Sequence, residues 1–418
     1  MPAELHLWVW QSTGWPPIKV DVQALSATLG RTRSELGKLL GKIEAVGKAD
    51  IALSARDIWT QDALATAAIE GEALNLDAVR SSVAKRLGVA SDYKPAVPRD
   101  IEGLLDVMED AATKWDTDLT EERLFSWHHE LFPQEKNSLR QITPGQYRVA
   151  PEPMQIVSGR MTREKVHYEA PPSVSVPIQM RKFLTWFNAT RDDGQTDGLV
   201  RAALAHLWFE SIHPFEDGNG RIGRAILDMA IAQDMRSNFR MHGLSIELRD
   251  QQQQYYDALN RVQRCEADPS SWTIWLLDSL RLACQSSSRV VDQALDRARF
   301  WSRHRDVDLN ERQRKVLNKM LEAGPGGFEG GMTPKKLQSI ASVAGATATR
   351  DLVELVEKGL MVRRAAGRST RYELALEGWE WKPIAPRSNS STKQTAFDTV
   401  QLATILIRNI RAELASYT

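Results

Sequence analysis

The sequence predicts a mainly α-helical protein that carries one small β-hairpin and has a smaller α+β unit near its C-terminus. Apolar residues recur at the helical period through most of the chain, which predicts the helices. The stretch 143–176 is instead rich in Pro and Gly around short extended pieces, which predicts the hairpin. A chain of 418 residues is too long for one ordinary core, so two or three domains are expected.

The composition limits the class of protein. Lys and Arg together number 54, as do Asp and Glu, so no net charge steers the whole chain to nucleic acid or membrane. Cys265 and Cys284 are the only cysteines, which excludes a disulfide scaffold and a four-cysteine zinc site. The first residues do not form a signal peptide and no apolar run is long enough to cross a bilayer, so a cytoplasmic protein is expected.

The first 50 residues combine three tryptophans with one helical pattern. Trp8, Trp10 and Trp15 fall within eight positions, and apolar residues then recur at helical spacing over 25–43. Large aromatic side chains bury much surface, so a packed role is favoured over a ligand cage.

The next predicted helix covers about 55–74. Thr66 and Glu70 are four residues apart and share one face, and Gly71 follows where the helix bends or ends. Taken alone, this is an ordinary amphipathic helix. Further on, the predicted helix 121–131 contains His128 and His129, which point in different directions, so packing is favoured over joint metal binding.

The densest group of chemically versatile residues lies at 213–224, which we call the anion loop. The helix predicted over 198–212 ends at Pro214, so His213 lies at its exit. A second apolar helix, 222–235, follows the glycines of the loop. Its first backbone N–H groups have no partner within the helix and carry the positive end of its dipole, so this edge predicts an anion site.

Side chains in the anion loop fit phosphate chemistry. Arg221 and Arg224 are one turn apart and offer two guanidinium groups to phosphate oxygens. Asp217 is a hard oxygen ligand suited to Mg²⁺. His213 has an ordinary pKa suited to proton transfer near neutral pH, which makes it the candidate general base. A purely structural turn is the alternative, but it needs neither the histidine nor two arginines.

The anion loop resembles the motif of the Fic (filamentation induced by cAMP) family, His-x-Phe-x-Asp/Glu-Gly-Asn-Gly-Arg-x-x-Arg, at every defined position. Family members of this kind transfer AMP from ATP to a hydroxyl side chain of a protein. The resemblance implies that His213 accepts the hydroxyl proton, that Asp217 positions Mg²⁺, and that Phe215 anchors the loop. It assigns ATP to Gly218, Asn219, Gly220, Arg221, Ile222, Gly223 and Arg224, with Arg224 on the γ-phosphate.

The same resemblance gives other segments a role. Residues 66–71 match the inhibitory motif Ser/Thr-x-x-x-Glu-Gly/Asn, which implies that Glu70 pairs with Arg224 and displaces the γ-phosphate. The hairpin around 156–170 would be a flap that adds a strand to the target's peptide; an ordinary surface hairpin is the alternative. Tyr256 would face adenine, with Asn260 one turn further on.

Residues 310–374 form a separate pattern that resembles a winged helix-turn-helix. Helices are predicted over 311–323, 333–341 and 347–359, followed by a basic hairpin over 361–374. The arginines that could meet DNA phosphates are Arg350, Arg363, Arg364, Arg368 and Arg371. The third helix also carries Asp351, Glu354 and Glu357, so docking of a protein is the alternative.

The predicted domains are an N-terminal helical module with the inhibitory helix (1–100), a Fic-type helical core with its hairpin flap (101–305), a winged-helix domain (306–384), and a linker with a C-terminal helix (385–418). The polar linker covers 385–394, and the helix, 397–414, would close the fold or join two subunits.

We therefore expect a cytoplasmic, Mg²⁺-dependent protein adenylyltransferase that modifies Ser, Thr or Tyr hydroxyls of a target protein and of itself, acts as a homodimer and is autoinhibited by Glu70. Two alternatives stay open: a DNA-binding winged-helix regulator whose Fic-like domain senses nucleotide, and a Fic-type enzyme that removes AMP. A di-iron site is disfavoured, because His213 is at a helix end and the second Glu-x-x-His pair, 164–167, is in an extended segment. A P-loop is disfavoured too, since its motif is absent.

Overall fold

The computed structural model describes residues 8–45, 48–89, 96–133, 142–158, 165–238, 240–326, 328–364 and 370–379. The protein is mainly helical, as the sequence predicts. It divides into two compact units, Met1–Arg299 and Phe300–Thr418, and each is described on its own. The four-domain division stays a prediction. The expected linker 385–394 and C-terminal helix 397–414 lie outside the described residues.

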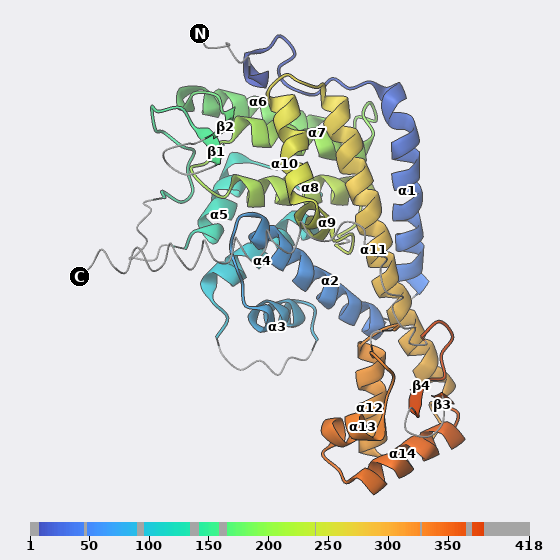
Figure 1. Ribbon diagram of the computed structural model, residues 1–418. Coiled ribbons are helices and arrows are strands. Elements are labelled where there is room, and N and C mark those ends of the chain that lie inside the picture. Colours follow the sequence, from blue (N-terminus) through green and yellow to red (C-terminus); the bar gives the residue numbers. More distant parts are fainter. Residues whose placement is uncertain are drawn as a thin grey trace, which may run out of the picture. The chain divides into compact units, whose positions relative to one another are not determined.

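Two helices form the centre of the first unit, α7 (Gly198–Ile212) and α8 (Asn219–Met235) (Figure 1). All side chains of α7 from Leu199 to Ile212 are buried, as are nearly all those of α8. A helix that is apolar on every side is stable only when other elements surround it. The anion loop connects these two helices, so the core of the unit fixes both of its ends.

Other helices surround this pair. Their order along the chain is α1 (Val22–Ala45), α2 (Lys48–Ile69), α3 (Leu76–Arg86), α4 (Arg99–Thr113), α5 (Glu121–Leu131), α6 (Val176–Ala189), α9 (Leu244–Asp250), α10 (Gln252–Gln263) and α11 (Pro269–Arg303), with short 3-10 turns at η1 (Val9–Gln11) and η2 (Ser173–Ser175). One continuous hydrophobic core includes Leu36 of α1, Ile58 of α2, Phe209 of α7 and Leu276 of α11. The N-terminal helices therefore share their core with the helices that hold the anion loop.

A buried ion network joins α2 to α8. Arg240 lies 3.0 Å from the Asp228 carboxylate of α8 and 3.4 Å from the Asp62 carboxylate of α2, and the three side chains are less than one tenth exposed. The Asp62 carboxylate also accepts a 2.8 Å hydrogen bond from the Ser245 N–H at the start of α9. Because the surroundings have a low dielectric constant, breaking any of these contacts would strongly lower the free energy of unfolding.

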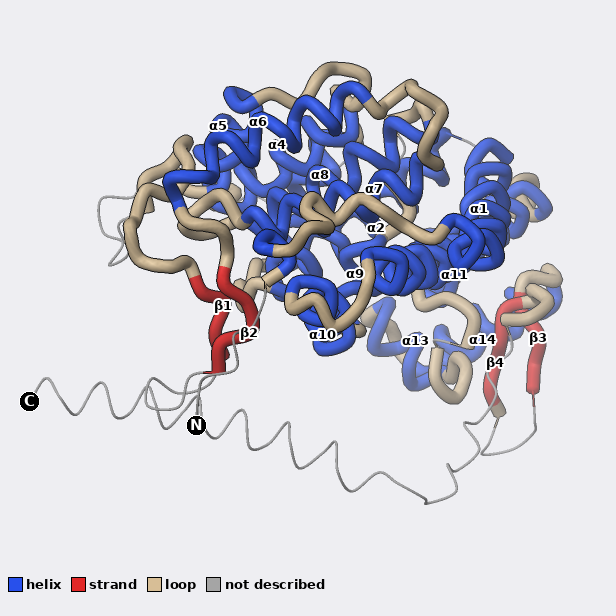
Figure 2. The backbone as a smooth tube through the Cα atoms, turned by 90° about the horizontal axis from the view of Figure 1, so that it is seen from above, coloured by secondary structure: helices blue, strands red, loops and turns tan. Residues whose placement is uncertain are grey.

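The expected hairpin is present as β1 (Gln155–Ser158) and β2 (Lys165–Glu169), which pair antiparallel with Ile156 opposite Tyr168. It extends from the helical body in Figure 2. The hydroxyl of Tyr168 is buried and donates a 2.6 Å hydrogen bond to the Ser211 carbonyl, two residues before His213. This contact ties the hairpin to the C-terminal end of α7.

The second unit contains α12 (Glu311–Glu322), α13 (Pro334–Ala341), α14 (Gly345–Glu357), β3 (Met361–Arg364) and β4 (Arg371–Leu374). The two strands pair antiparallel, and Met332 forms an isolated bridge to Tyr372. The helices and strands follow the predicted order, while the assignment to the winged-helix family stays a prediction. No described helix combines the length and apolar character needed to span a bilayer.

Candidate functional site

The anion loop begins at a left-handed residue. His213 caps α7 with φ 51° and ψ 61°, and its N–H donates a 3.0 Å hydrogen bond to the Phe209 carbonyl. Few residues other than glycine adopt this conformation, and where they do, the surrounding structure must hold them there. Gly218 then takes φ 79° as the N-cap of α8. These two turns place the imidazole beside the N-terminus of the next helix.

The interior of the loop is held by its own side chains. The Asn219 amide accepts a hydrogen bond from the Phe215 N–H and donates one to the Phe215 carbonyl, each at 2.9 Å. Phe215 is fully buried and its ring stacks on His128 at 4.3 Å, which agrees with the predicted anchor and with a packing role for His128. Asn219 therefore fixes the loop backbone, from which the first N–H groups of α8 can meet an anion.

A cavity of about 570 Å³ lies over this backbone. It is lined by His213, Asp217 and the three residues 218–220, together with Ile156 and Val157 of the hairpin. Gly220 lets the Glu70 side chain approach the backbone closely, because a Cβ at this position would lie 2.2 Å from the Glu70 carboxylate and would force that side chain to shift. The helix N-terminus, a carboxylate and the imidazole thus face one common space.

The second arginine of the loop is bonded through Nη2 and Nε to residues at the C-terminal end of α2, while its buried Nη1 has no hydrogen-bond partner among the described residues. Arg224 is 3% exposed, and its Nη2 donates at 2.7 Å to the Glu70 carboxylate and at 3.0 Å to the Thr66 carbonyl. Its Nε donates at 2.7 Å to the Thr66 hydroxyl. Burial opposes the charge of Arg224, but the attraction of Glu70 is larger in sum, so the pKa of Arg224 is raised. The structure thus places Thr66 and Glu70 on the arginine that the sequence assigns to the γ-phosphate.

The His213 ring is largely buried and lies near the Glu210 carboxylate. Burial, and next the positive charge of Arg148, lower its pKa to about 4. The imidazole is therefore neutral at neutral pH and can accept a proton. The Glu210 carboxylate lies 3.9 Å from His213 Nδ1; burial, and next the charge of Glu70, raise the pKa of Glu210 to about 8.

A second cavity, of about 470 Å³, also contains His213 and Arg224 and continues toward α10. Tyr256 and Asn260 line it, and the Tyr256 hydroxyl donates a 3.1 Å hydrogen bond to the Ile69 carbonyl at the end of α2. Tyr255 lines the same cavity but is only 2% exposed, and its hydroxyl lies 2.8 Å from His206 Nε2. Tyr256 is 37% exposed, so it offers the larger surface of the two tyrosines.

Asp217 is the acidic residue of the anion loop that the sequence predicts to position a cation, and it lines the first cavity. Its side chain is 36% exposed, and one carboxylate oxygen accepts a hydrogen bond from the Gly218 N–H at 2.6 Å. Within the described part of the chain no three His, Cys, Asp or Glu side chains gather as a metal site. Asp217 shares the first cavity with Glu70 and Glu216, and one carboxylate of such a site suits Mg²⁺ that also binds phosphate oxygens. It does not suit a di-iron centre, and Glu164 lies outside the described residues.

Sequence reasoning did not assign a role at the site to Glu72 or Glu210. Glu210 lies one helical turn before His213 and forms with it the first Glu-x-x-His pair, which enters the sequence analysis only through the disfavoured di-iron site. Glu72 pairs with Arg221 and follows Glu70 by two residues. Their short distance in sequence from Glu70 and from His213 was the signal that could have revealed Glu72 and Glu210.

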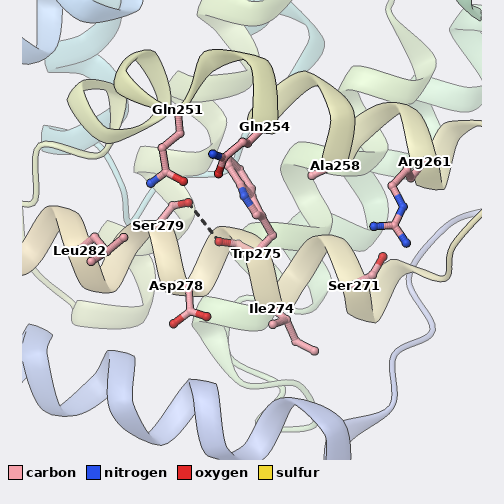
Figure 3. Close-up of a pocket in the computed structure, with 10 residues that line it drawn as sticks. All are labelled: Gln251, Gln254, Ala258, Arg261, Ser271, Ile274, Trp275, Asp278, Ser279 and Leu282. Carbon is pink, nitrogen blue, oxygen red and sulfur yellow. Dashed lines mark hydrogen bonds between the residues drawn. The ribbon is translucent and has the colours of Figure 1, made fainter. Parts of the chain in front are cut away.

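A different cavity lies between α10 and α11 (Figure 3), with a volume of about 340 Å³. Gln254 and Arg261 of α10 line it from one side, and Trp275 and Ser279 of α11 line it from the other. None of its lining residues belongs to the anion loop or is a histidine. The chemistry assigned above therefore lies in the two cavities around His213.

We predict that His206 makes the fold sensitive to acid. The ring is fully buried, and burial lowers its pKa to about 4. Between pH 6.5 and 4 the His206 ring binds a proton in the unfolded chain but not in the folded chain. The contribution of His206 to the free energy of unfolding is therefore complete above pH 6.5 and decreases as the pH falls. The His206 contribution lost by pH 5 is about 2 kcal/mol.

Urea unfolding at pH 7.5 and pH 5.0 checks this prediction. The loss of stability between the two pH values should be about 2 kcal/mol larger for the wild type than for His206→Gln, whose side chain does not titrate. Equal losses in both proteins would show that His206 is not the group responsible.

Two parts of the chain match known families. Residues 8–89 match a domain of unknown function (DUF4172), and residues 118–231 match the Fic/DOC family. Both matches fall within the first compact unit.

Individual proteins share shorter stretches. The chain is 34% identical over 67 residues to a probable protein adenylyltransferase, aq_aa38, of Aquifex aeolicus (strain VF5), which covers 16% of this chain and 20% of that protein. It is 34% identical over 109 residues to protein adenylyltransferase fic-1 of Caenorhabditis elegans, covering 25% of this chain and 18% of that one. The chain thus spans about a fifth of the length of these relatives. A crystal structure of a Fic family protein from Desulfovibrio desulfuricans G20 superposes with a TM-score of 0.49 at 20% identity, covering 86% of this chain and 98% of that chain.

Proposed function

Since this chain is a Fic family protein, with its Fic/DOC domain at residues 118–231, we propose that it is an autoinhibited protein adenylyltransferase, which transfers AMP from ATP to a hydroxyl side chain of a protein. One observation carries the proposal: a neutral, buried imidazole and the N-terminus of α8 face the same cavity. Such a site can bind an anion and remove a proton beside it.

The chemistry follows from the positions of these groups. His213 takes the proton of the incoming hydroxyl, whose oxygen attacks the α-phosphorus of ATP. The bond from the α-phosphorus to the bridging oxygen breaks, and pyrophosphate leaves. The N–H groups at residues 219–221 and the Arg221 guanidinium stabilise the negative charge on the phosphates. Arg224 would hold the γ-phosphate once it is released from Glu70.

Mg²⁺ fits this scheme at Asp217. When bound, it would neutralise phosphate charge and hold the leaving pyrophosphate. Asp217 would contribute one carboxylate oxygen, and the remaining ligands would be phosphate oxygens and water, an arrangement that Mg²⁺ commonly adopts. Tyr256 and Asn260 line the far end of the second cavity, where the base of the nucleotide would lie.

The hairpin suits a protein substrate. Ile156 and Val157 of β1 line the same cavities as His213. A peptide that paired with the hairpin through its backbone would bring a side-chain hydroxyl to the imidazole with little demand on its sequence. The identity of the target and of the modified residue is not encoded in these contacts.

Autoinhibition follows from the position of Glu70. A carboxylate 2.7 Å from Arg224 occupies the guanidinium and repels a γ-phosphate that would bind there. ATP would then lack the contact that aligns its α-phosphorus with the hydroxyl.

The test uses the Glu70→Gly variant with Mg²⁺ and ATP labelled either at the α- or at the γ-phosphate. We expect α-label on protein, at a level at least about tenfold above wild type because Arg224 regains a charge-assisted contact to phosphate. The γ-label should remain in solution as pyrophosphate. Label from the γ-phosphate on protein would indicate a kinase, and no label from either position would refute the transferase.

For the second unit we propose a winged-helix fold that docks a protein. Asp351 is buried and pairs with Arg312, so Glu354 and Glu357 are the acidic residues that the third helix can offer to a protein partner. Arg364 and Arg371 both lie beside Glu373, which offsets the charge they would offer to DNA phosphates. Arg368 lies outside the described residues.

A further inference from the structure

Two carboxylates from the segment after α2, those of Glu70 and Glu72, contact arginines of the anion loop. The helix ends in a Schellman cap: the Gly71 N–H donates to the Ala68 carbonyl and the Glu72 N–H donates to the Ala67 carbonyl, each at 3.0 Å. This cap requires the left-handed conformation that Gly71 adopts, with φ 81°. The backbone of Glu72 is therefore fixed relative to Glu70 by hydrogen bonds rather than by chance contacts of a free loop.

Glu72 is paired with the first arginine of the loop. Arg221 Nη1 lies 2.8 Å from one Glu72 carboxylate oxygen and 3.1 Å from the other. Arg221 is 6% exposed, stacks over the Phe132 ring at 5.0 Å, and has Nη2 3.8 Å from the Asp217 carboxylate. The guanidinium is thus held in one place, with its polar edge toward two carboxylates.

We propose that Glu72 is a second inhibitory carboxylate, which occupies Arg221 as Glu70 occupies Arg224. The inference rests on the proposed function in taking Arg221 as a phosphate ligand. A guanidinium offers few edges to an anion, so a phosphate that binds Arg221 Nη1 must displace the Glu72 carboxylate. Both arginines of the site are then blocked by one short segment, 70–72.

Glu70 and Glu72 are expected to differ in how strongly they oppose phosphate binding. Glu70 is 27% exposed and meets a guanidinium that is almost fully buried, whereas Glu72 is 43% exposed. Solvent screens the more exposed pair more strongly, so Glu72 is expected to have the smaller effect. Removing Glu70 alone leaves Arg221 occupied, and the site is then only partly released.

The test measures nucleotide binding, which does not depend on whether transfer occurs. Isothermal titration with ATP, without added metal, compares the wild type, Glu70→Gly, Glu72→Gln, and Glu70→Gly combined with Glu72→Gln. In the Glu70→Gly background, Glu72→Gln should lower the dissociation constant for ATP by about three- to tenfold, since a screened charge pair no longer competes. Glu72→Ala in the same background should act in the same direction.

Glu109→Gln is the matched control. Glu109 is 40% exposed and pairs with the largely buried Arg86 at 3.0 Å, so the ion pair is of the same kind but lies outside the site. It should leave ATP affinity unchanged. If Glu72→Gln and Glu72→Ala also leave it unchanged in a background that binds ATP, the inference is overturned. If the Glu72 variants bind ATP more tightly while no label ever reaches protein, the transferase proposal fails. The inference that Glu72 blocks phosphate binding at Arg221 is then still supported.

Discussion

Replacing His213 by alanine in the Glu70→Gly background is expected to lower AMP transfer by about 10²- to 10⁴-fold, the range that a general base contributes. The ring carries no phosphate contact in the proposed scheme, so the dissociation constant for ATP should change by less than about threefold. Transfer is measured with α-labelled ATP, and affinity by titration calorimetry.

His129→Ala provides the control for this experiment. His129 is exposed on α5 and lines neither of the cavities that contain His213, so its removal should leave both transfer and ATP affinity at the level of the background variant. Transfer that survives without His213 would assign proton removal to another group. Loss of ATP affinity together with transfer would instead assign His213 to binding.

Replacing Arg240 by methionine is expected to lower the free energy of unfolding by about 3–5 kcal/mol, the usual cost of leaving buried charges unpaired. The substitution keeps an apolar side chain of similar length, but Asp62 and Asp228 then face each other without a cation. Urea unfolding of the full chain measures the effect.

Arg33→Met is the control for Arg240→Met. Arg33 also joins two carboxylates, those of Asp197 and Asp234, but its side chain is 40% exposed. Exposed ion pairs contribute about 0–1 kcal/mol, so this variant should unfold close to wild type. A loss below about 1 kcal/mol for Arg240→Met would mean that water reaches the network or that the two aspartates become neutral.

The anion loop could be located from sequence because its chemistry is local. A histidine at a helix exit, glycines at the next helix start and two arginines one turn apart define a site within a dozen residues, and the structure folds them around common cavities. The hairpin could be predicted for the same reason, since alternating residues and turn signals lie close together in the chain.

Apart from the pair between Glu70 and Arg224, which the family resemblance implied, contacts between distant segments could not be predicted. Glu72 lies outside the inhibitory pattern, and only the cap at Gly71 and the packing of α2 bring it to Arg221. The pairing of Asp62 with Arg240 joins residues 178 positions apart. Asp351 reads as a surface charge on an amphipathic helix, yet it is buried against Arg312 of another helix. No periodicity in a single segment contains this information.

The helix that ends immediately before Glu70, α2, shares one hydrophobic core with α7 and α11. Ile58, Ala63 and Ala67 would all lose their apolar neighbours if that helix left as a unit, so its complete departure amounts to partial denaturation. In the proposed autoinhibition Glu70 therefore stays beside Arg224 at a fixed local concentration, and dilution should not activate the protein. Activation would instead come from a side chain changing rotamer within an intact scaffold, a movement that a bound nucleotide or target peptide could favour.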